Sequence, residues 1–151
     1  MTRNDKDYMK IALKKAEIAY NLDEVPIGSV IVCDGKIISS AYNTRNKTQN
    51  AVNHAEMLAI SKACKKIKSW RLINATIYVT LEPCPMCLGA ILNSRIKRVC
   101  FGAYDKSSKQ NLTNIILNDD RLNHKTIIDG GVLEDECSKI LSTFFKQKRE
   151  N

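Results

Sequence analysis

The chain has 151 residues, of which 44% are hydrophobic and 26% charged, a composition that is typical of one globular domain over 1–151 and excludes a disordered chain. With 24 lysines and arginines against 16 aspartates and glutamates, the formal net charge of +8 is compatible with a polyanionic partner. The N-terminus has no apolar leader and no later run is long enough to cross a bilayer, so we expect a cytoplasmic protein with no membrane contact.

The first third of the chain predicts a helix followed by a hairpin. Apolar residues recur at helical spacing from Tyr8 to Tyr20, opposite a lysine-rich face. Two β-rich runs, Ile27 to Cys33 and Lys36 to Ser40, flank Asp34-Gly35, which is a strong signal for a two-residue turn. We therefore expect an amphipathic helix and two antiparallel strands.

The central part predicts helices that pack on a parallel pair of strands. His54 to Ile67 has one apolar face, and Ala75 to Thr80 is a short buried strand. A helix through about Asn93 then leads into the strand Arg98 to Gly102, a linkage that suits a parallel crossover. The segment after Thr80 therefore lies where ligands bind in open α/β sheets, at the carboxyl end of a strand.

The last third carries weaker signals for a helix, an edge strand and a final helix. Asn111 to Leu117 predicts the short helix, His124 to Ile128 the edge strand, and Asp129-Gly130-Gly131 a turn. Leu133 to Arg149 places apolar residues at helical spacing before a basic end. The whole pattern of helices and strands predicts an α/β fold.

Two short segments contain residues suited to binding a metal. Cys84 and Cys87 lie three positions apart in one helical turn, and His54 comes from a separate segment. Two thiolates and an imidazole suit Zn²⁺, and three protein ligands leave a fourth position for water, as in catalytic sites. The metal would lower the pKa of that water to about 7, and Glu56 is placed to move protons between the water and a substrate.

The residues beside these ligands favour thiolates at a helix N-terminus. Pro85 suits the first position of a helix, which places Cys84 at the N-cap and both sulfurs near unpaired N–H groups. Asn53 is a good N-cap for the helix that begins near His54. Two residues at spacing i, i+2 can both serve one ion only from a helix end, and His54 and Glu56 lie at such an end.

Simpler interpretations exist for each residue alone. Asn53 and Glu56 resemble a capping box, and a Cys-x-x-Cys pair could be a redox pair or half of a structural zinc site. Another cysteine could also close the metal site. The four that we otherwise interpret as reduced core residues are Cys33, Cys64, Cys100 and Cys137. The combination of His-x-Glu with Pro-Cys-x-x-Cys, however, is the signature of zinc-dependent nucleobase deaminases.

Basic residues gather in three clusters that could form one rim for RNA. The clusters are Lys62, Lys65, Lys66, Lys68 and Arg71, then Arg95, Lys97 and Arg98, then Lys146, Lys148 and Arg149. Solvated lysines are the simpler interpretation. Phe144 and Phe145 lie near the third cluster, and core positions or base-stacking platforms would both suit them.

The chain resembles the bacterial tRNA-specific adenosine deaminase family (TadA) within the cytidine deaminase-like superfamily. The resemblance covers Glu24-Val25-Pro26-Ile27-Gly28, His54-Ala55-Glu56, Tyr78-Val79-Thr80-Leu81-Glu82-Pro83-Cys84-Pro85-Met86-Cys87, Ser94-Arg95-Ile96, Phe101-Gly102-Ala103, Asn123-His124 and Phe144-Phe145. It implies a three-layer α/β/α sandwich with a central mixed five-stranded sheet, a homodimer and one Zn²⁺ per chain. It also implies a hydrolase that converts the wobble adenosine of a tRNA anticodon to inosine and releases ammonia.

The resemblance also implies roles for individual residues. His54, Cys84 and Cys87 would be the zinc ligands and Glu56 the proton shuttle. The residues that would contact the flipped base and the anticodon loop are Asn43, Asp105, Asn123, Phe145 and Arg149. The chain departs from the family in having no glycine from Lys106 to Thr113, which bears on the shape of the RNA-facing loop, and in having Ala51-Val52-Asn53 before its histidine.

Two other functions share parts of this pattern. A deaminase of a free base or nucleoside, of the guanine or cytosine type, would use the same zinc motif without a basic surface. A non-catalytic RNA-binding protein would use a closed structural zinc site. An exchangeable water on the metal would exclude the RNA-binding protein with a closed zinc site. A comparison of an anticodon stem-loop with free adenosine, guanine and cytosine as substrates would distinguish a tRNA deaminase from a deaminase of free bases or nucleosides.

Overall fold

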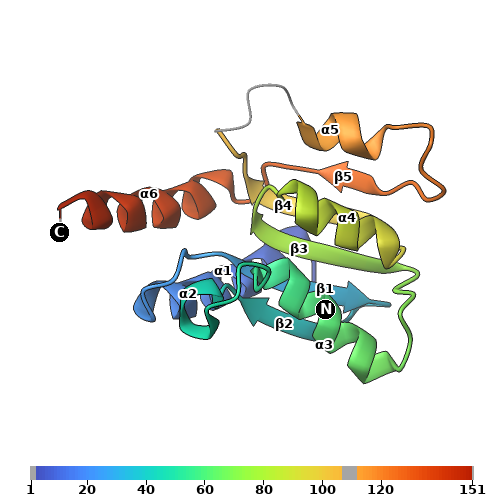
Figure 1. Cartoon of the computed structure of the whole chain (residues 1–151), viewed down its shortest axis with the longest axis horizontal. Helices are drawn as coiled ribbons and strands as arrows, with labels where there is room; N and C mark the ends of the chain where they lie inside the picture. The colour runs from blue at the N-terminus through green and yellow to red at the C-terminus, as the bar shows by residue number, and fades with distance from the viewer. Residues whose placement is uncertain (1–2, 107–111, 151) are drawn as a thin grey trace.

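The computed structural model describes residues 3–106 and 112–150, which form a five-stranded sheet with helices on both faces (Figure 1). The elements in chain order are α1 (Asp5–Asn21), β1 (Gly28–Cys33), β2 (Lys36–Tyr42), α2 (Arg45–Thr48), α3 (Ala55–Ile67), β3 (Ala75–Leu81), α4 (Pro85–Asn93), β4 (Arg98–Ala103), α5 (Leu112–Leu117), β5 (Ile127–Asp129) and α6 (Glu134–Glu150). The strand order is β2-β1-β3-β4-β5. The predicted mixed sheet is confirmed, since β1 is antiparallel to β2 and β3 while β3, β4 and β5 are parallel.

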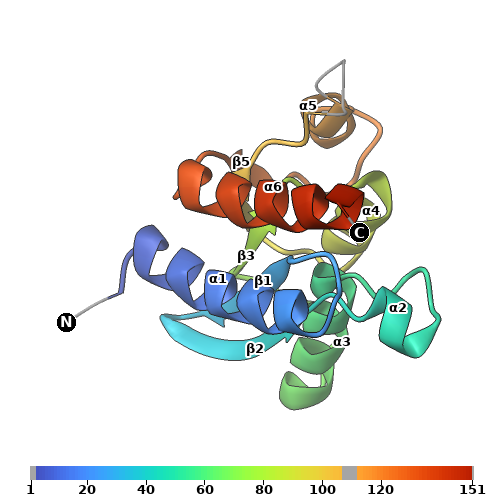
Figure 2. The same cartoon turned by 90° about the vertical axis from the view of Figure 1, so that its left-hand side faces the viewer.

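The helices form two layers, which confirms the predicted α/β/α sandwich. Figure 1 shows α3 and α4 in front of the strands, and Figure 2 shows α1 and α6 side by side on the other face. Successive residues of a strand point to opposite faces of the sheet. Accordingly, Val30 of β1 belongs to a buried cluster with Met9 and Leu141, whereas Ile31 belongs to one with Ala59 and Ile91.

The predicted hairpin forms between β1 and β2. Asp34 and Gly35 have φ angles of 51° and 76°, the left-handed conformation that a two-residue type I′ turn requires. The strands that this turn joins pair from Gly28 with Tyr42 to Cys33 with Lys36, with one irregularity at Ile31/Val32. The end of β2 therefore lies beside the start of β1, and Asn43 is the first residue after β2.

Helix α1 begins three residues before the apolar pattern predicts it. The side chain of Asn4 accepts a hydrogen bond from the N–H of Asp7 at 3.0 Å, and the carboxylate of Asp7 accepts one from the N–H of Asn4 at 2.9 Å. This capping box extends the helix into a polar turn. Asp5 in that turn accepts two 2.8 Å hydrogen bonds from Arg98 of β4 and one of 2.7 Å from the hydroxyl of Tyr78 on β3.

Strand β5 is shorter than the sequence predicts. It covers Ile127–Asp129 at the sheet edge. The expectation of a strand over His124 to Ile128 is wrong for residues 124–126, and Asp129, expected in a turn, is the last strand residue. His124 and Thr126 instead direct side-chain hydrogen bonds to the carbonyl of Ile96, at 2.8 and 2.9 Å. The carbonyl of Ile96 lies in the connection between α4 and β4. Because His124 and Thr126 bind it through their side chains, the backbone pairing between β4 and β5 begins only at Ile127.

Two further segments differ from the prediction. The four-residue helix α2 has no apolar periodicity and was not predicted. The helix expected from Asn111 is α5, which begins at Leu112 in the described part of the chain; Asn111 itself and the rest of residues 107–111 of the glycine-free segment lie outside it.

The basic clusters do not form one rim. The C-terminal end of α3, which carries the first cluster, and the C-terminal end of α6, which carries the third, lie at opposite ends of the molecule in Figure 1. Arg98 of the second cluster forms ion pairs with Asp5 and Asp129. A search of the described residues found no helix that combines the length and apolar character needed to span a membrane.

Candidate metal and catalytic site

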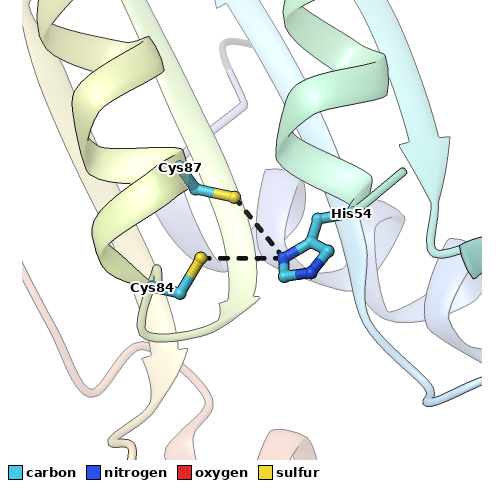
Figure 3. A group of neighbouring side chains, drawn as sticks. All are labelled: His54, Cys84 and Cys87. Carbon is cyan, nitrogen blue, oxygen red and sulfur yellow. Dashed lines mark hydrogen bonds between the residues drawn. The ribbon is translucent and has the colours of Figure 1, made fainter. Parts of the chain in front are cut away.

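The N-termini of α3 and α4 lie side by side just beyond the end of β3, and three polar side chains converge there (Figure 3). Cys84 is the N-cap of α4 with φ −73° and ψ 168°, and Pro85 is the first helical residue, as the sequence predicts. Cys87 follows within the first turn and is buried, with a relative exposure of 0%. The fixed φ of proline starts the helix at this point, so both sulfurs lie at its open end.

His54 faces both sulfurs across the gap between the two helices. Its Nδ1 atom lies 3.7 Å from Sγ of Cys84 and 3.7 Å from Sγ of Cys87, and the ligand atoms of this set all lie within 4.8 Å of one another. Ligands on one tetrahedral Zn²⁺, at about 2.0 to 2.3 Å from the metal, are separated by similar distances. The residues present therefore fit a zinc ion.

The part of the chain that the structure describes adds no fourth histidine, cysteine or carboxylate to this set. The other four cysteines are free, and none belongs to the cluster. Cys100 and Cys137 are core residues of the opposite layer, as predicted, while Cys33 and Cys64 are only partly buried. A set of three protein ligands is typical of catalytic zinc sites and not of structural ones.

Hydrogen bonding in the cluster favours a thiolate at Cys84. The thiol of Cys87 donates to Cys84, and together with the N–H groups of the helix N-terminus and the nearby His54 it lowers the pKa of Cys84 to about 5. The pKa of Cys87 is raised because its thiol is the donor of that hydrogen bond and is buried. One sulfur is thus already in the form that binds metal.

Glu56 is buried beside the cluster with a relative exposure of 4%, and its Oε1 atom has no hydrogen-bond partner among the described residues. Burial raises the pKa of this carboxyl group above its usual value, because the low-dielectric surroundings penalise the charged form. A buried polar atom without a partner calls for a ligand or water that satisfies it. The carboxyl group is therefore poised to exchange a proton with a molecule at the cluster.

The alternative interpretation of Asn53 and Glu56 as a capping box is wrong, as is the prediction of Asn53 as the N-cap. The N-cap of α3 is His54 and not Asn53, and no side chain makes a capping hydrogen bond there. The amide of Asn53 donates instead to Oγ1 of Thr48 at 2.8 Å. The interpretation of Glu56 as a mere helix-start residue therefore lacks the contact on which it depends.

Asn43 follows the end of β2 and is held by three hydrogen bonds. Its N–H donates to the carbonyl of Ile27 at 3.1 Å, its Oδ1 accepts from the N–H of Arg45 at 3.1 Å, and its Nδ2 donates to the carbonyl of Val25 at 3.4 Å. The next residue, Thr44, donates its N–H to the carbonyl of Asn53, directly before His54. Asn43 is thus buried, with a relative exposure of 6%, and tied to the segment that carries the histidine.

Comparison with known proteins assigns the chain to a family. Residues 3–149 match the family model described as MafB19-like deaminase. The tRNA-specific adenosine deaminase of Bacillus subtilis is 48% identical over 97% of this chain and 91% of its own, and that of Haemophilus influenzae is 44% identical over 97% and 86%. The chain belongs to the tRNA-specific adenosine deaminase family.

Solved structures agree with this assignment. A structure from a study of A-to-I editing by tRNA:A34 deaminases at the wobble position of transfer RNA has a TM-score of 0.83 and 36% identity, over 89% of this chain and 98% of that one. Guanine deaminase from Bacillus subtilis has a TM-score of 0.67 and 29% identity, over 99% and 96%. The cytidine deaminase-like fold is thus confirmed, and the chain is a hydrolase of the deaminase class.

The structure brings three of the residues expected to contact RNA in a tRNA adenosine deaminase around one cavity of about 380 Å³. They are Asp105, Phe145 and Arg149, and the same cavity is lined by Val25 and Tyr104. Phe145 is 43% exposed, whereas Phe144 is buried and packs edge-on against Tyr20. Of the two phenylalanines, the second alone presents a ring to solvent.

Asn123 lies elsewhere. It borders a separate cavity of about 270 Å³ beside the C-terminal end of α4, with Arg95, Arg121 and His124. The structure does not bring it to the cavity that Asp105, Phe145 and Arg149 share.

Sequence reasoning missed two carboxylates near the site of this deaminase. Glu82 stands just before Pro83 and accepts hydrogen bonds from the N–H of Asp105 and from Thr113. Glu24 is 1% exposed and accepts hydrogen bonds from two N–H groups of α2. Both lie within segments that carry the family resemblance, but a single sequence gives no signal for partners more than 20 residues away.

Proposed function

We propose that this protein is a tRNA adenosine deaminase that hydrolyses the wobble adenosine of a tRNA anticodon to inosine and releases ammonia. The observation that carries the proposal is the unpaired, buried carboxylate oxygen of Glu56 beside the converging His54, Cys84 and Cys87. The relatives named tRNA-specific adenosine deaminases, at 44–48% identity, support RNA as the substrate in preference to a free base. Because tRNA is used in the cytoplasm, we also propose a cytoplasmic location for this protein.

We propose that His54, Cys84 and Cys87 hold one Zn²⁺ per chain. Bound Zn²⁺ lowers the pKa of water and so supplies a nucleophile near neutral pH. The lowered pKa of Cys84 keeps that ligand ionised without a neighbouring base. The imidazole contributes Nδ1, the ring atom that faces both sulfurs.

Glu56 moves the protons of the reaction. Its carboxylate accepts a proton from the attacking water and delivers it to N1 of the adenine, while the oxygen adds to C6. It then takes the remaining proton from the new hydroxyl group on C6 and delivers it to the amino group. The C6–N bond breaks, ammonia leaves, and the oxygen becomes the C6 carbonyl of inosine. Burial raises the pKa of this carboxyl group, which makes its carboxylate a stronger base toward the attacking water and so supports this role.

The amide of Asn43 holds the base. A side-chain amide has two donor hydrogens and an acceptor oxygen with two lone pairs, and Val25 and Arg45 each occupy one of these sites. One donor and one acceptor position remain for the substrate. This pair can read a base edge that presents an acceptor and a donor side by side, as adenine does at N7 and its amino group.

The cavity between the β4 end and α6 would take the neighbouring nucleotides. Arg149 suits a phosphate, and the exposed ring of Phe145 suits a stacked base. Asp105 would bind a base or ribose hydroxyl at the same cavity. A role for Asn123 stays a prediction of the family resemblance, as does the homodimer, for which the exposed side chains of Ile67 and Trp70 offer apolar surface.

The decisive test supplies purified, zinc-loaded protein with an anticodon stem-loop carrying adenosine at the wobble position. Parallel reactions contain the same stem-loop with guanosine there, free adenosine, guanine and cytosine. Mass spectrometry should find inosine in the first stem-loop alone, at a rate that falls as salt is raised, because phosphate contacts are screened. Turnover of a free base without turnover of the stem-loop would overturn the proposal.

A further inference from the structure

Glu24 is a buried carboxylate that the proposed chemistry does not use. It lies in the connection between α1 and β1 with a relative exposure of 1%. No lysine, arginine or histidine of the described ranges 3–106 and 112–150 forms an ion pair with it. Burying a carboxylate is costly unless hydrogen bonds compensate, so its partners identify what the residue does.

Those partners are backbone N–H groups of α2. Oε1 accepts from the N–H of Asn46 at 3.0 Å, and Oε2 accepts from the N–H of Lys47 at 2.6 Å. These are the second and third positions of a helix whose N-cap, Thr44, makes no side-chain capping bond. Glu24 therefore supplies, from 22 and 23 residues away, the cap that the helix lacks locally.

A four-residue helix is not stable alone, because forming its first turn fixes several dihedral angles for a single hydrogen bond. Its shape must come from tertiary contacts, and the two hydrogen bonds that Glu24 accepts from Asn46 and Lys47 are of the strong kind that carboxylate oxygens form with N–H groups. Helix α2 lies in the connection that begins at Asn43 and ends at His54. The cap thus fixes a segment with a proposed site residue at each end.

The hydrogen bonds form a closed ring through Asn43. Glu24 is next in sequence to Val25, whose carbonyl accepts from Nδ2 of Asn43. At the other side, Arg45 donates its N–H to Oδ1 of Asn43 and precedes Asn46, which Glu24 binds. One carboxylate therefore holds both partners of the Asn43 amide in place.

We infer that Glu24 is a positioning residue for the deamination: its carboxylate caps α2 and so orients the amide of Asn43 toward the base. This inference rests on the proposed function for the contact between Asn43 and the base. The orientation of the Asn43 amide, in contrast, can be observed without substrate, so that part of the inference does not depend on the proposed function.

The test compares Glu24→Gln with the wild type and with Glu17→Gln, a matched control on the exposed surface of α1. A glutamine has one acceptor oxygen, and its NH₂ group meets a backbone N–H at the other position. Glu24→Gln should keep its zinc and remain folded at the assay temperature, while kcat/KM for the stem-loop falls at least tenfold. Glu17→Gln should stay within twofold of the wild type.

A double-mutant comparison with Asn43→Ala separates positioning from general loosening of the fold. If Glu24 acts through Asn43, adding Glu24→Gln to Asn43→Ala should change kcat/KM by less than threefold. Full multiplication of the two effects, or wild-type kcat/KM in Glu24→Gln, would overturn the inference.

A readout without chemistry distinguishes this inference from the proposed function. The side-chain amide signals of Asn43 in a ¹⁵N-correlated NMR spectrum, assigned with Asn43→Asp, should shift in Glu24→Gln and stay in place in Glu17→Gln. Unmoved signals would refute positioning even if the wild type deaminates the stem-loop. Shifted signals with an inactive wild type would refute the proposed function alone.

Discussion

The carboxylate of Glu82 accepts a hydrogen bond from the backbone N–H of Asp105, with 3.0 Å between Oε1 and the nitrogen. Its second oxygen accepts one from Oγ1 of Thr113 at 2.5 Å. Because Glu82 lies two residues before Cys84, a single side chain joins the segment with a proposed metal ligand to the wall of the cavity proposed for RNA.

Replacing Glu82 by alanine should therefore affect both stability and activity. The loss of two hydrogen bonds to a charged acceptor should lower the free energy of unfolding by about 1–3 kcal/mol, as measured by urea denaturation. In Thr113→Val, which keeps the side-chain shape and removes one donor, the loss should be smaller. We expect kcat/KM for the stem-loop to fall in the same order, and wild-type values in Glu82→Ala would show that the link is dispensable.

Glu56→Ala should retain zinc and lose turnover. Removal of a general acid and base typically costs about 10²–10⁴-fold in rate, and Glu56 serves both roles in the proposed reaction. Metal content is measured by elemental analysis and turnover by ammonia release, with the exposed Glu17→Ala as the control. A rate near that of the wild type would remove Glu56 from the chemistry.

Cys87→Ala should lose the metal. Two remaining ligands hold Zn²⁺ much more weakly than three, so native mass spectrometry should find the metal-free mass in this variant. Cys100→Ala makes the same change at another buried cysteine, in the layer away from the cluster, and should keep its zinc. Full occupancy in Cys87→Ala would mean that the ligand set is different.

A methyl group at Gly28 should destabilise the fold. A Cβ atom there would lie 2.0 Å from the carbonyl oxygen of Ala12 and 2.7 Å from the nitrogen of Ala16, so that α1 must move away from β1. We expect Gly28→Ala to lower the free energy of unfolding by about 1–3 kcal/mol. Gly89→Ala, in an open position inside α4, should instead raise it by about 0.5–1 kcal/mol, and equal values for the two variants would contradict the close approach.

The ion pair between Asp5 and Arg98 should make stability depend on acid pH. The hydrogen bond from Arg98 is the main cause that holds the pKa of Asp5 below its usual 3.8. A carboxyl group with a lowered folded pKa stabilises the protein above its unfolded pKa, and this contribution disappears as the pH falls through the folded pKa. Asp5 is partly exposed, so solvent screening limits the contribution to about 1 kcal/mol.

Asp5→Asn should accordingly be less stable than the wild type at pH 6, and the difference should shrink below about pH 4. Thermal unfolding of both proteins from pH 6 to pH 2.5 measures it. A difference that stays constant over this range would assign the effect to packing and not to charge.

The candidate metal site could be predicted because its signals are local. Pro85 fixes the start of α4, and this alone places the sulfurs of Cys84 and Cys87 at one helix end. The two-residue turn at Asp34-Gly35 and the parallel β3–α4–β4 unit were predicted for the same reason, since turn chemistry and short-range periodicity encode them.

The local structures that the sequence did not predict depend on which of several possible hydrogen-bond partners a side chain binds. Asn53 has the chemistry of an N-cap, yet its side chain binds Thr48 and leaves the cap position to His54. His124 and Thr126 bind a carbonyl where the sequence predicts a strand. A residue with several possible partners takes the one that the fold brings within reach, and the sequence alone does not give those distances.

The sequence by itself determined the α/β class, most of the helices and strands, and the histidine and two cysteines as candidate ligands, because helical and strand periods and proline chemistry act within a few residues. Only the tertiary structure decided that Glu24 caps a helix at a residue 22 positions away, that Glu82 binds Asp105, and that Asn123 lies at another cavity from Phe145. These relationships depend on the order of strands in the sheet and on which loops it brings together. Such contacts arise from packing across the whole chain, so no local pattern records them.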